Sequence, residues 1–415
     1  MQKSHILFFL LLFSSVLVVG QNNTSSPYSM FGIGEIEANK SARTIAIGGT
    51  GIAVRSEYFL NSQNPASYCG IDSQMFILDA GLQMKQALFT YKSLKQTNNS
   101  TNLSNLALGF RFTSHWATSF SISPYSSVGY KINTHKTVEG TEDKFDILTE
   151  GSGGVNRASW GNSFKFLKNR LALGVNLSYL FGNITQTETS SGNLFAGTIV
   201  TTDNIHVSNP YITYGLQYRV LERENFKFTL GGVYGYKTGL NLEKSETIVD
   251  NSGSTLADNV LSTGTYYIPT FYGFGLACEL HKNTNIYFDY KKELWGESGN
   301  VSTTNNYTNS TEYRLGAEII PSLSFKAAYF KKIQYRVGVY NKSSYIKIAE
   351  GQLQNYGASC GLGLPLDNGR YYLNISYQYG FYGIFNSSNV INQNYHLISL
   401  SLNFLDIWFA KTKFD

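Results

Sequence analysis

Residues 171–179, with the sequence LALGVNLSY, carry the pattern that decides the fold class. Leucine, valine and tyrosine occupy the odd positions, whereas alanine, glycine, asparagine and serine occupy the even ones. Successive side chains of a β-strand point to opposite faces, so this segment is predicted to be a strand with one apolar and one small or polar face. The same alternation recurs at residues 106–113, 212–219 and 398–404.

Two features distinguish a membrane-spanning barrel from a soluble β-sandwich, which would alternate in the same way. The segments reach about ten residues, the length that a tilted spanning strand needs, whereas strands of soluble sheets average about 5–6. Aromatic residues also recur at the ends of the apolar faces, as expected for interfacial girdles. These residues are Tyr234, Tyr236, Tyr290, Trp295, Tyr377 and Tyr379. The pattern therefore predicts an all-β transmembrane antiparallel barrel in the outer membrane of a Gram-negative bacterium.

About 14 such segments can be counted, an even number as bacterial barrels require. They begin near residues 75, 103, 116, 156, 169, 205, 226, 264, 284, 310, 334, 353, 371 and 394. The connections at residues 166–171 and 220–226 are tight and are predicted to be periplasmic turns. Four long connections rich in Asn, Ser, Thr and Gly are predicted to be loops that face the cell exterior. These are residues 131–155, 183–204, 242–263 and 297–309.

The chain begins with a segment typical of export. Lys3 provides a positive charge, an apolar stretch follows, and Val18 and Gly20 offer small residues before a cleavage site at Gln21. A buried or spanning N-terminal helix is the alternative, but the stretch is short for a span. We therefore predict a signal peptide at residues 1–20, a Gly-rich N-terminal hatch inside the lumen at residues 21–74, and the barrel at residues 75–415.

Composition supports this division. Tyr 30, Phe 27 and Gly 39 are abundant, and charged residues make up 15% of the chain, below the roughly 25% of soluble domains. The formal net charge of +5 is too small to indicate nucleic-acid binding. The three cysteines, Cys69, Cys278 and Cys360, are far apart and show no metal-ligand spacing, so we assign them no role.

No catalytic or cofactor-binding set is evident. The segment that contains Gly48, Gly49 and Gly51 has a glycine-rich character, but it lacks the complete spacing and the Lys-Ser/Thr pair of a phosphate-binding loop. A tight backbone crossing inside the hatch is the preferred interpretation. The histidines are isolated, so we expect no metal site, no cofactor and no enzyme activity, although a catalytic set that converges at the barrel rim stays open.

Several short motifs carry a family resemblance. The sequence Asn64-Pro65-Ala66-Ser67, after the glycines at residues 48–51, resembles the NPA segment of the FadL-type family of outer-membrane channels for hydrophobic compounds. Residues 313–318, Pro321 and residues 335–340 look like the paired late strands of that family. Residues 28–34 and 361–366 resemble the corresponding segments of its Bacteroidetes branch.

The resemblance implies a 14-stranded barrel with an N-terminal hatch, in which residues 48–51 and 64–67 pack against the inner wall. It also implies passage of long-chain fatty acids or other hydrophobic molecules, with lateral release through a kinked strand into the outer-membrane lipids. Pro124, between Ser123 and Tyr125, lies inside the third predicted strand, where a missing N–H favours such an opening. A proline near a strand end is the alternative.

Two other functions remain open at this stage. One branch of the family acts as a shuttle in a Bacteroidetes protein-secretion system, so a binding role with a secretion-system partner is the main alternative to transport. The other is a structural barrel without transport.

Overall fold

The computed structural model describes most of the chain after the predicted signal peptide. The described residues are 26–37, 40–137, 144–192, 197–300, 306–322, 324, 326–348 and 350–407. The predicted signal peptide and the predicted interface anchors Trp408 and Phe409 lie outside these residues.

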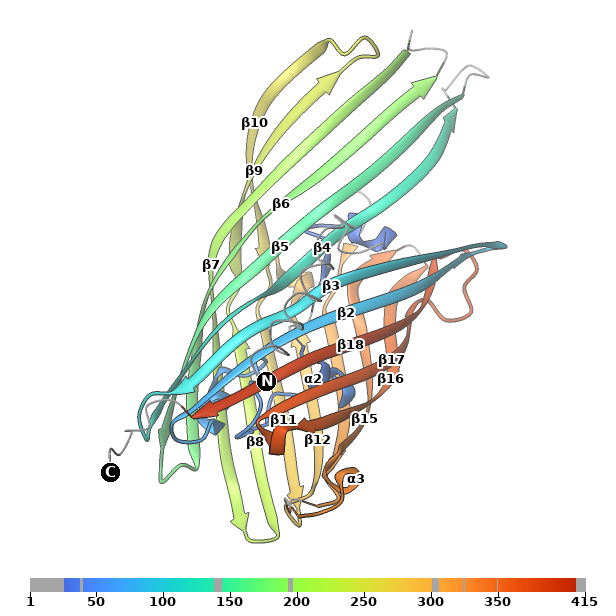
Figure 1. Ribbon diagram of the computed structural model, residues 1–415. Coiled ribbons are helices and arrows are strands. Elements are labelled where there is room, and N and C mark those ends of the chain that lie inside the picture. The colour runs from blue at the N-terminus through green and yellow to red at the C-terminus, as the bar shows by residue number, and fades with distance from the viewer. Residues whose placement is uncertain are drawn as a thin grey trace, which may run out of the picture.

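The strands form one closed antiparallel barrel of 14 strands, which confirms the predicted fold class and strand count (Figure 1). The first six positions are β2 (Met75–Tyr91), β3 (Leu94–Arg111), β4 (Trp116–Thr137), β5 (Lys144–Phe166), β6 (Leu171–Gly192) and β7 (Gly197–Arg223). The next two are each interrupted: β8 (Phe226–Gly235) with β9 (Thr238–Val249), and β10 (Thr255–Ile268) with β11 (Phe271–Leu280). The last six are β12 (Thr284–Glu293), β14 (Ser310–Ile319), β15 (Gln334–Ile348), β16 (Gly351–Leu366), β17 (Tyr371–Gly383) and β18 (Asn392–Ile407). Pairing of β18 with β2, from Asn392↔Thr90 to Ile407↔Met75, closes the barrel.

The apolar face of each spanning strand points outward. On β6, Leu173 and Leu177 are 40% and 42% exposed. On the opposite face of the same strand, Ala172 is fully buried and Asn176 is 7% exposed. A soluble sandwich would bury the leucines instead. Exposed apolar residues outside and small or polar residues inside are what a barrel surrounded by lipid requires.

The barrel wall is much taller on one side than on the other. Strands β4–β7, β9 and β10 rise together well above the ends of β15–β18 (Figure 1). Their pairing continues almost to the hairpin tips, to Thr137↔Lys144, Gly192↔Gly197 and Val249↔Thr255. We call the described part of it, residues 131–137, 144–155, 183–192, 197–207 and 240–265, the tall wall.

The prediction that residues 131–155, 183–204 and 242–263 are irregular loops is therefore wrong in secondary structure. These segments are polar, but they are rich in threonine, isoleucine and valine, which favour extended backbone. The polar composition of these segments indicates strands with water on both faces, and it does not indicate irregular loops. Of residues 297–309, the described part includes the end of η3 (Trp295–Glu297) and β13 (Asn306–Tyr307), which pairs with β15.

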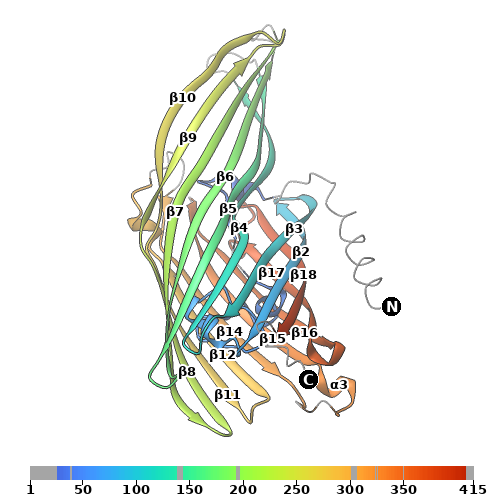
Figure 2. The same cartoon turned by 60° about the vertical axis from the view of Figure 1, so that its left-hand side comes forward.

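The N-terminal residues form short elements inside the barrel, and those that follow residue 40 lie in its lower half (Figure 2). These elements are η1 (Pro27–Met30), β1 (Glu35–Ile36), α2 (Ala42–Ala46) and η2 (Pro65–Gly70). β1 pairs with β4, α2 packs against β15–β18, and η2 packs against β3–β7. The remaining short elements, α3 (Tyr329–Lys332) and η4 (Asp367–Gly369), lie in the turns before β15 and β17.

Candidate functional site

The predicted glycines of residues 48–51 lie where the N-terminal backbone touches the wall. Gly48 has a φ of +71°, and a Cβ there would lie 2.7 Å from the carbonyl oxygens of Leu315 and Val339. Its N–H donates to Ser359 Oγ at 3.1 Å. A glycine is required here both by the left-handed backbone and by this close approach.

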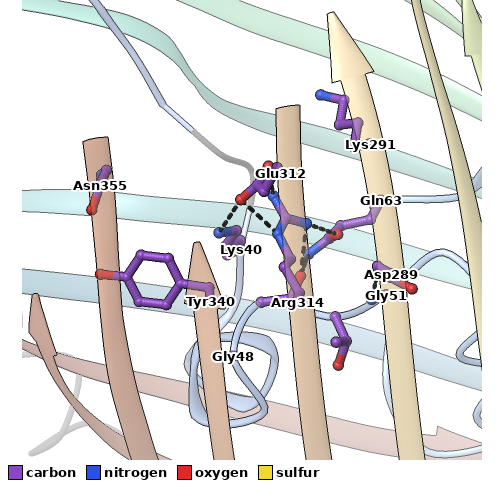
Figure 3. Close-up of polar contacts among 12 residues, drawn as sticks. Lys40, Gly48, Gly51, Gln63, Asp289, Lys291, Glu312, Arg314, Tyr340 and Asn355 are labelled. Carbon is purple, nitrogen blue, oxygen red and sulfur yellow. Dashed lines mark hydrogen bonds and ion pairs between the residues drawn. The ribbon is translucent and has the colours of Figure 1, made fainter. Parts of the chain in front are cut away.

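Gly49 and Gly51 are held by charged side chains of the wall. The Gly51 N–H donates to Asp289 Oδ2 at 2.6 Å, and the Gly49 carbonyl accepts from Arg314 Nη1 at 2.8 Å (Figure 3). Gln63 donates to the same Gly49 carbonyl at 3.0 Å. The three glycines thus contact β12, β14, β15 and β16.

The predicted segment Asn64–Ser67 lies against the opposite side of the barrel. Asn64 caps η2 by accepting from the Ala66 N–H at 3.0 Å, and its Nδ2 donates to the Ile52 carbonyl at 2.6 Å. Pro65 stands at the first helical position, and Ser67 Oγ donates to the Asn61 carbonyl at 2.7 Å. The NPA sequence therefore builds a capped turn that is buried against β4–β7.

Sequence reasoning missed the ion cluster that holds α2. Glu318 on β14 accepts from Arg43 Nη2 at 2.9 Å and from Arg336 Nε at 2.7 Å. All three side chains are almost fully buried, and both guanidinium groups lie over the ring of Phe59. A buried charge is tolerable only when it is paired, so this cluster fixes α2 to the wall.

A second charged cluster lies nearer the start of β14, around Glu312 and Arg314 (Figure 3). Arg314 binds both oxygens of Glu312, at 2.7 and 2.6 Å, and Lys40 Nζ lies 4.0 Å from Glu312. Burial, together with the neighbouring Arg314, lowers the pKa of Lys40 from 10.5 to about 7. Burial, together with Glu35, raises the pKa of Glu37 from 4.5 to about 7. The two N-terminal groups therefore both change charge near neutral pH.

Two cavities lie between the N-terminal segment and the wall. The first, of about 130 Å³, is lined on β4, β5 and β7 by Tyr125, Arg157 and Tyr211, with Trp295 and Lys291 opposite. Arg157 Nε is buried and has no hydrogen-bond partner in the described part of the chain. The second cavity, of about 150 Å³, is lined by residues that include Lys40, Lys85, Glu312, Tyr340 and Tyr395. Both cavities join aromatic and charged side chains, so neither is a purely apolar tunnel.

Pairing between β3 and β4 stops just before the predicted wall defect. In the described residues, the last β3–β4 pair is Leu106↔Ile122, and Ser123, Pro124 and Tyr125 follow it. On the other side Pro124 stays paired with Asn156 of β5, and a register shift follows. Ser123 is buried, and Tyr125 lines the first cavity. The proline thus lies where one neighbour of β4 is lost.

The N-terminal segment pairs with the edge of β4 that is no longer paired with β3. The register of β1 with β4 is Ile36↔Ser126, and the Glu37 N–H donates to the Tyr125 carbonyl at 2.9 Å. Ser126 Oγ donates to the Ile33 carbonyl at 2.7 Å. Residues 26–37 therefore cover the break in the wall from the lumen side.

The cysteines form no disulfide: Cys69, Cys278 and Cys360 are all free. Cys69 is buried next to Ser163, whose Oγ lies 2.9 Å from its Sγ. Within the described residues there is no group of three or more His, Cys, Asp or Glu side chains placed to hold a metal ion. No helix in the described ranges is long and apolar enough to span a membrane.

A family model described as BamG matches residues 1–415, the full length of the sequence. The chain belongs to the BamG family. The search of curated proteins found no match to the chain.

Solved structures of outer-membrane barrels share the fold of this BamG-family chain. A FadL homologue of Pseudomonas aeruginosa is similar with a TM-score of 0.62 at 11% identity, covering 89% of this chain and 99% of its own. The toluene transporter TbuX of Ralstonia pickettii gives 0.60 at 13%, covering 88% and 98%. The toluene transporter TodX of P. putida gives 0.59 at 15%, covering 89% and 99%. At these identities the similarity establishes the fold, which is the one that the sequence motifs suggested.

Proposed function

We propose that this protein is an outer-membrane channel for small hydrophobic or amphipathic molecules, with lateral release beside Pro124. The observation that carries the proposal is that Tyr125 belongs to both features: it lines the first cavity and directly follows the break in β3–β4 pairing. A ligand in the cavity would therefore lie next to the place where β4 loses its pairing with β3. The barrel of similar fold in TodX and TbuX belongs to toluene transporters, which supports a hydrophobic ligand.

The lining of the first cavity indicates which ligands fit. Tyr211 and Trp295 offer aromatic surface, and Arg157 offers a buried N–H without a partner. An unpaired buried donor is costly, so a ligand that accepts a hydrogen bond or carries an anionic group would gain affinity from it. An amphipathic molecule, with long-chain fatty acids as one candidate class, matches this lining better than a pure hydrocarbon.

Release by this route requires the N-terminal segment to move. Residues 26–37 hold the β4 edge through a few backbone bonds, among them Ser26 N to the Gly129 carbonyl at 3.0 Å. Since these bonds replace the missing β3 pairing, η1 and β1 act as a gate over the break. Opening the gate breaks these hydrogen bonds, at about 1 kcal/mol each, and separates the buried side chains of Tyr28 and Ile33 from the wall.

A disulfide across the gate tests the route. The double variant Ile36→Cys/Ser126→Cys joins two directly paired residues, whose Cα separation in an antiparallel sheet suits a disulfide. Uptake of a fluorescent fatty acid by proteoliposomes should fall by at least about tenfold on oxidation and recover with reductant. Equal uptake in both redox states would refute lateral release, and the reduced protein is its own control.

A proline substitution provides the matched comparison. Pro124→Val supplies the missing N–H and should slow uptake by favouring strand pairing at the break. Pro365→Val is the control, because Pro365 also lies in a strand, on β16 opposite Tyr372 of β17, and lines neither cavity. If both variants have the same effect, Pro124 has no special role.

The tall wall favours a second candidate, a binding or shuttle role with a partner of a secretion system. Its hairpins extend beyond the lumen and expose apolar side chains such as Leu256 and Leu261 at 60% and 77%. Removing the β9–β10 tip, residues 247–257, separates the two functions. Lost partner capture with unchanged fatty-acid uptake would favour the shuttle, whereas lost uptake would favour the channel.

A further inference from the structure

The connection between β14 and β15 differs from the others at its end of the barrel. The other turns there, at residues 112–115, 167–170, 224–225, 281–283 and 367–370, are short. This one spans residues 320–333 and contains α3 (Tyr329–Lys332), which lies at the foot of the barrel (Figure 2). Short turns mark the periplasmic end of a bacterial barrel, so α3 belongs at the periplasmic side.

A hydrogen bond places α3 on the lipid side of the wall rather than beneath the lumen. The hydroxyl of Tyr335 donates to the Phe330 carbonyl at 3.2 Å. Tyr335 points outward from β15, at 40% exposure, whereas its neighbours Gln334 and Arg336 are buried toward the lumen. Tyr335 pairs with Ile319 of β14, which is also exposed on the outer surface. The helix therefore lies at the outer rim, beside the row of lipid-facing side chains.

The exposed side chains of α3 combine aromatic surface with positive charge. Phe330 is 74% exposed and Tyr329 is 45% exposed, although both are large and apolar. The whole connection contains three lysines, Lys326, Lys331 and Lys332, and no acidic residue. The short turn at residues 224–225 is different, because Glu224 there pairs with Lys282.

We propose that α3 is an interfacial anchor that binds the phosphates of anionic phospholipids in the periplasmic leaflet. Phe330 inserts among the upper acyl carbons, and Lys331 and Lys326 bind headgroup phosphates. The arrangement suits this partner because aromatic rings favour the headgroup boundary and basic side chains are attracted to anionic lipid. The charge of the connection complements the lipid, and its place at the outer rim gives direct access. This inference does not depend on what the lumen transports.

Depth-dependent fluorescence quenching tests the anchor in the full-length protein. Phe330→Trp adds one tryptophan to the four native ones, and the wild-type signal is subtracted. In nanodiscs of phosphatidylglycerol brominated on the upper acyl carbons, the added emission should lose at least about half its intensity. The loss should be smaller in brominated phosphatidylcholine, and the difference should vanish in the triple variant that adds Lys326→Gln and Lys331→Gln.

Glu224→Trp is the matched control, because it places a tryptophan in an exposed turn at the same end of the barrel. It should remain accessible to aqueous acrylamide and should be little quenched by either brominated lipid. The proposal is overturned if Phe330→Trp is quenched no more than Glu224→Trp. It is also overturned if quenching is equal in the two lipids, since both carry a phosphate and only phosphatidylglycerol has a net negative charge.

Discussion

The two sides of this barrel hold the N-terminal segment in different ways. The short side, β14–β18, grips α2 through the buried charges of Glu318 and Arg336. The tall side, β4–β7, uses neutral groups: Ser163 donates to the Ala66 carbonyl of η2, and Gln217 donates to the Ile52 carbonyl that precedes it. The lesson is that one lumen can use strong, charge-dependent attachment on one wall and weaker, neutral attachment on the other. The weaker side is also the one that contains the proposed gate.

Breaking the buried charge cluster should have the largest effect. Glu318→Gln leaves two buried guanidinium groups without a counter-charge, which costs about 3–5 kcal/mol. Ser163→Ala, on the tall side, removes the hydrogen bond to the Ala66 carbonyl and should cost only about 1 kcal/mol. Hydrogen exchange of residues 41–54 and the urea midpoint in liposomes measure both. Similar losses in the two variants would remove the contrast between the walls.

The next effect separates the spanning part of a strand from its extension. Leu177→Arg places a charge on the lipid face of β6 and should cost about 2–4 kcal/mol, with poor assembly into liposomes. Thr187→Arg, ten residues further along the same strand, lies in the tall wall and should change stability by less than about 0.5 kcal/mol. The heat-modified mobility shift on a gel reports assembly. A severe defect in Thr187→Arg would place that region in the membrane.

A smaller, pH-dependent effect should come from Lys40. Its pKa is lowered from 10.5 to about 7 in the folded protein, so the unfolded chain binds more protons between these values. Stability should therefore rise with pH across the window from about 7 to 10.5, because folding requires Lys40 to release its proton and that release costs less as the pH rises. Lys40→Met should flatten this rise in urea midpoints. Lys168→Met, in an exposed turn, should keep the wild-type slope.

Shortening the tall wall should have the smallest effect on the barrel. Replacing residues 185–204 by a two-residue turn keeps the pairs Asn183↔His206 and Ile184↔Ile205 and removes only strand that lies beyond the lumen. The free energy of unfolding from urea titration should change by less than about 1 kcal/mol, because no lipid-facing or luminal packing is lost. A barrel that no longer assembles would mean that the tall wall is part of the folding unit.

The strands were predictable from sequence where lipid imposes a pattern. The alternation at residues 171–179 appears because one face meets hydrocarbon and the other meets the lumen, and it led to the correct strand count. The same strand continues through residues 183–192, where both faces meet water and the alternation ends. Alternation of apolar and polar residues appears only where the two faces of a strand meet different environments. It could not reveal residues 183–192 as a strand, and they were therefore predicted to be a loop.

The site was predictable only where it depends on local chemistry. Glycines at residues 48–51 and the capping sequence at residues 64–67 are recognisable because backbone geometry requires them. The ion cluster was not recognisable, because Arg43, Glu318 and Arg336 come from three distant segments that only the closed barrel brings together. The role of Pro124 in transport stays a prediction, since its position is described but its effect on uptake is not measured.

The attachment of the N-terminal segment to both walls has a consequence for the order of folding. η2 rests on strands made early in the chain, and α2 rests on β15–β18, which are made last. The seam between β2 and β18 joins the first barrel strand to the last. Its closure therefore has the largest entropic cost among the strand pairings, because the two strands are the farthest apart in sequence. Because α2 binds the late strands from within, it shortens that search by holding them near the early half. The segment thus acts as an internal template, and we expect its docking and the sealing of the seam to occur in one kinetic step.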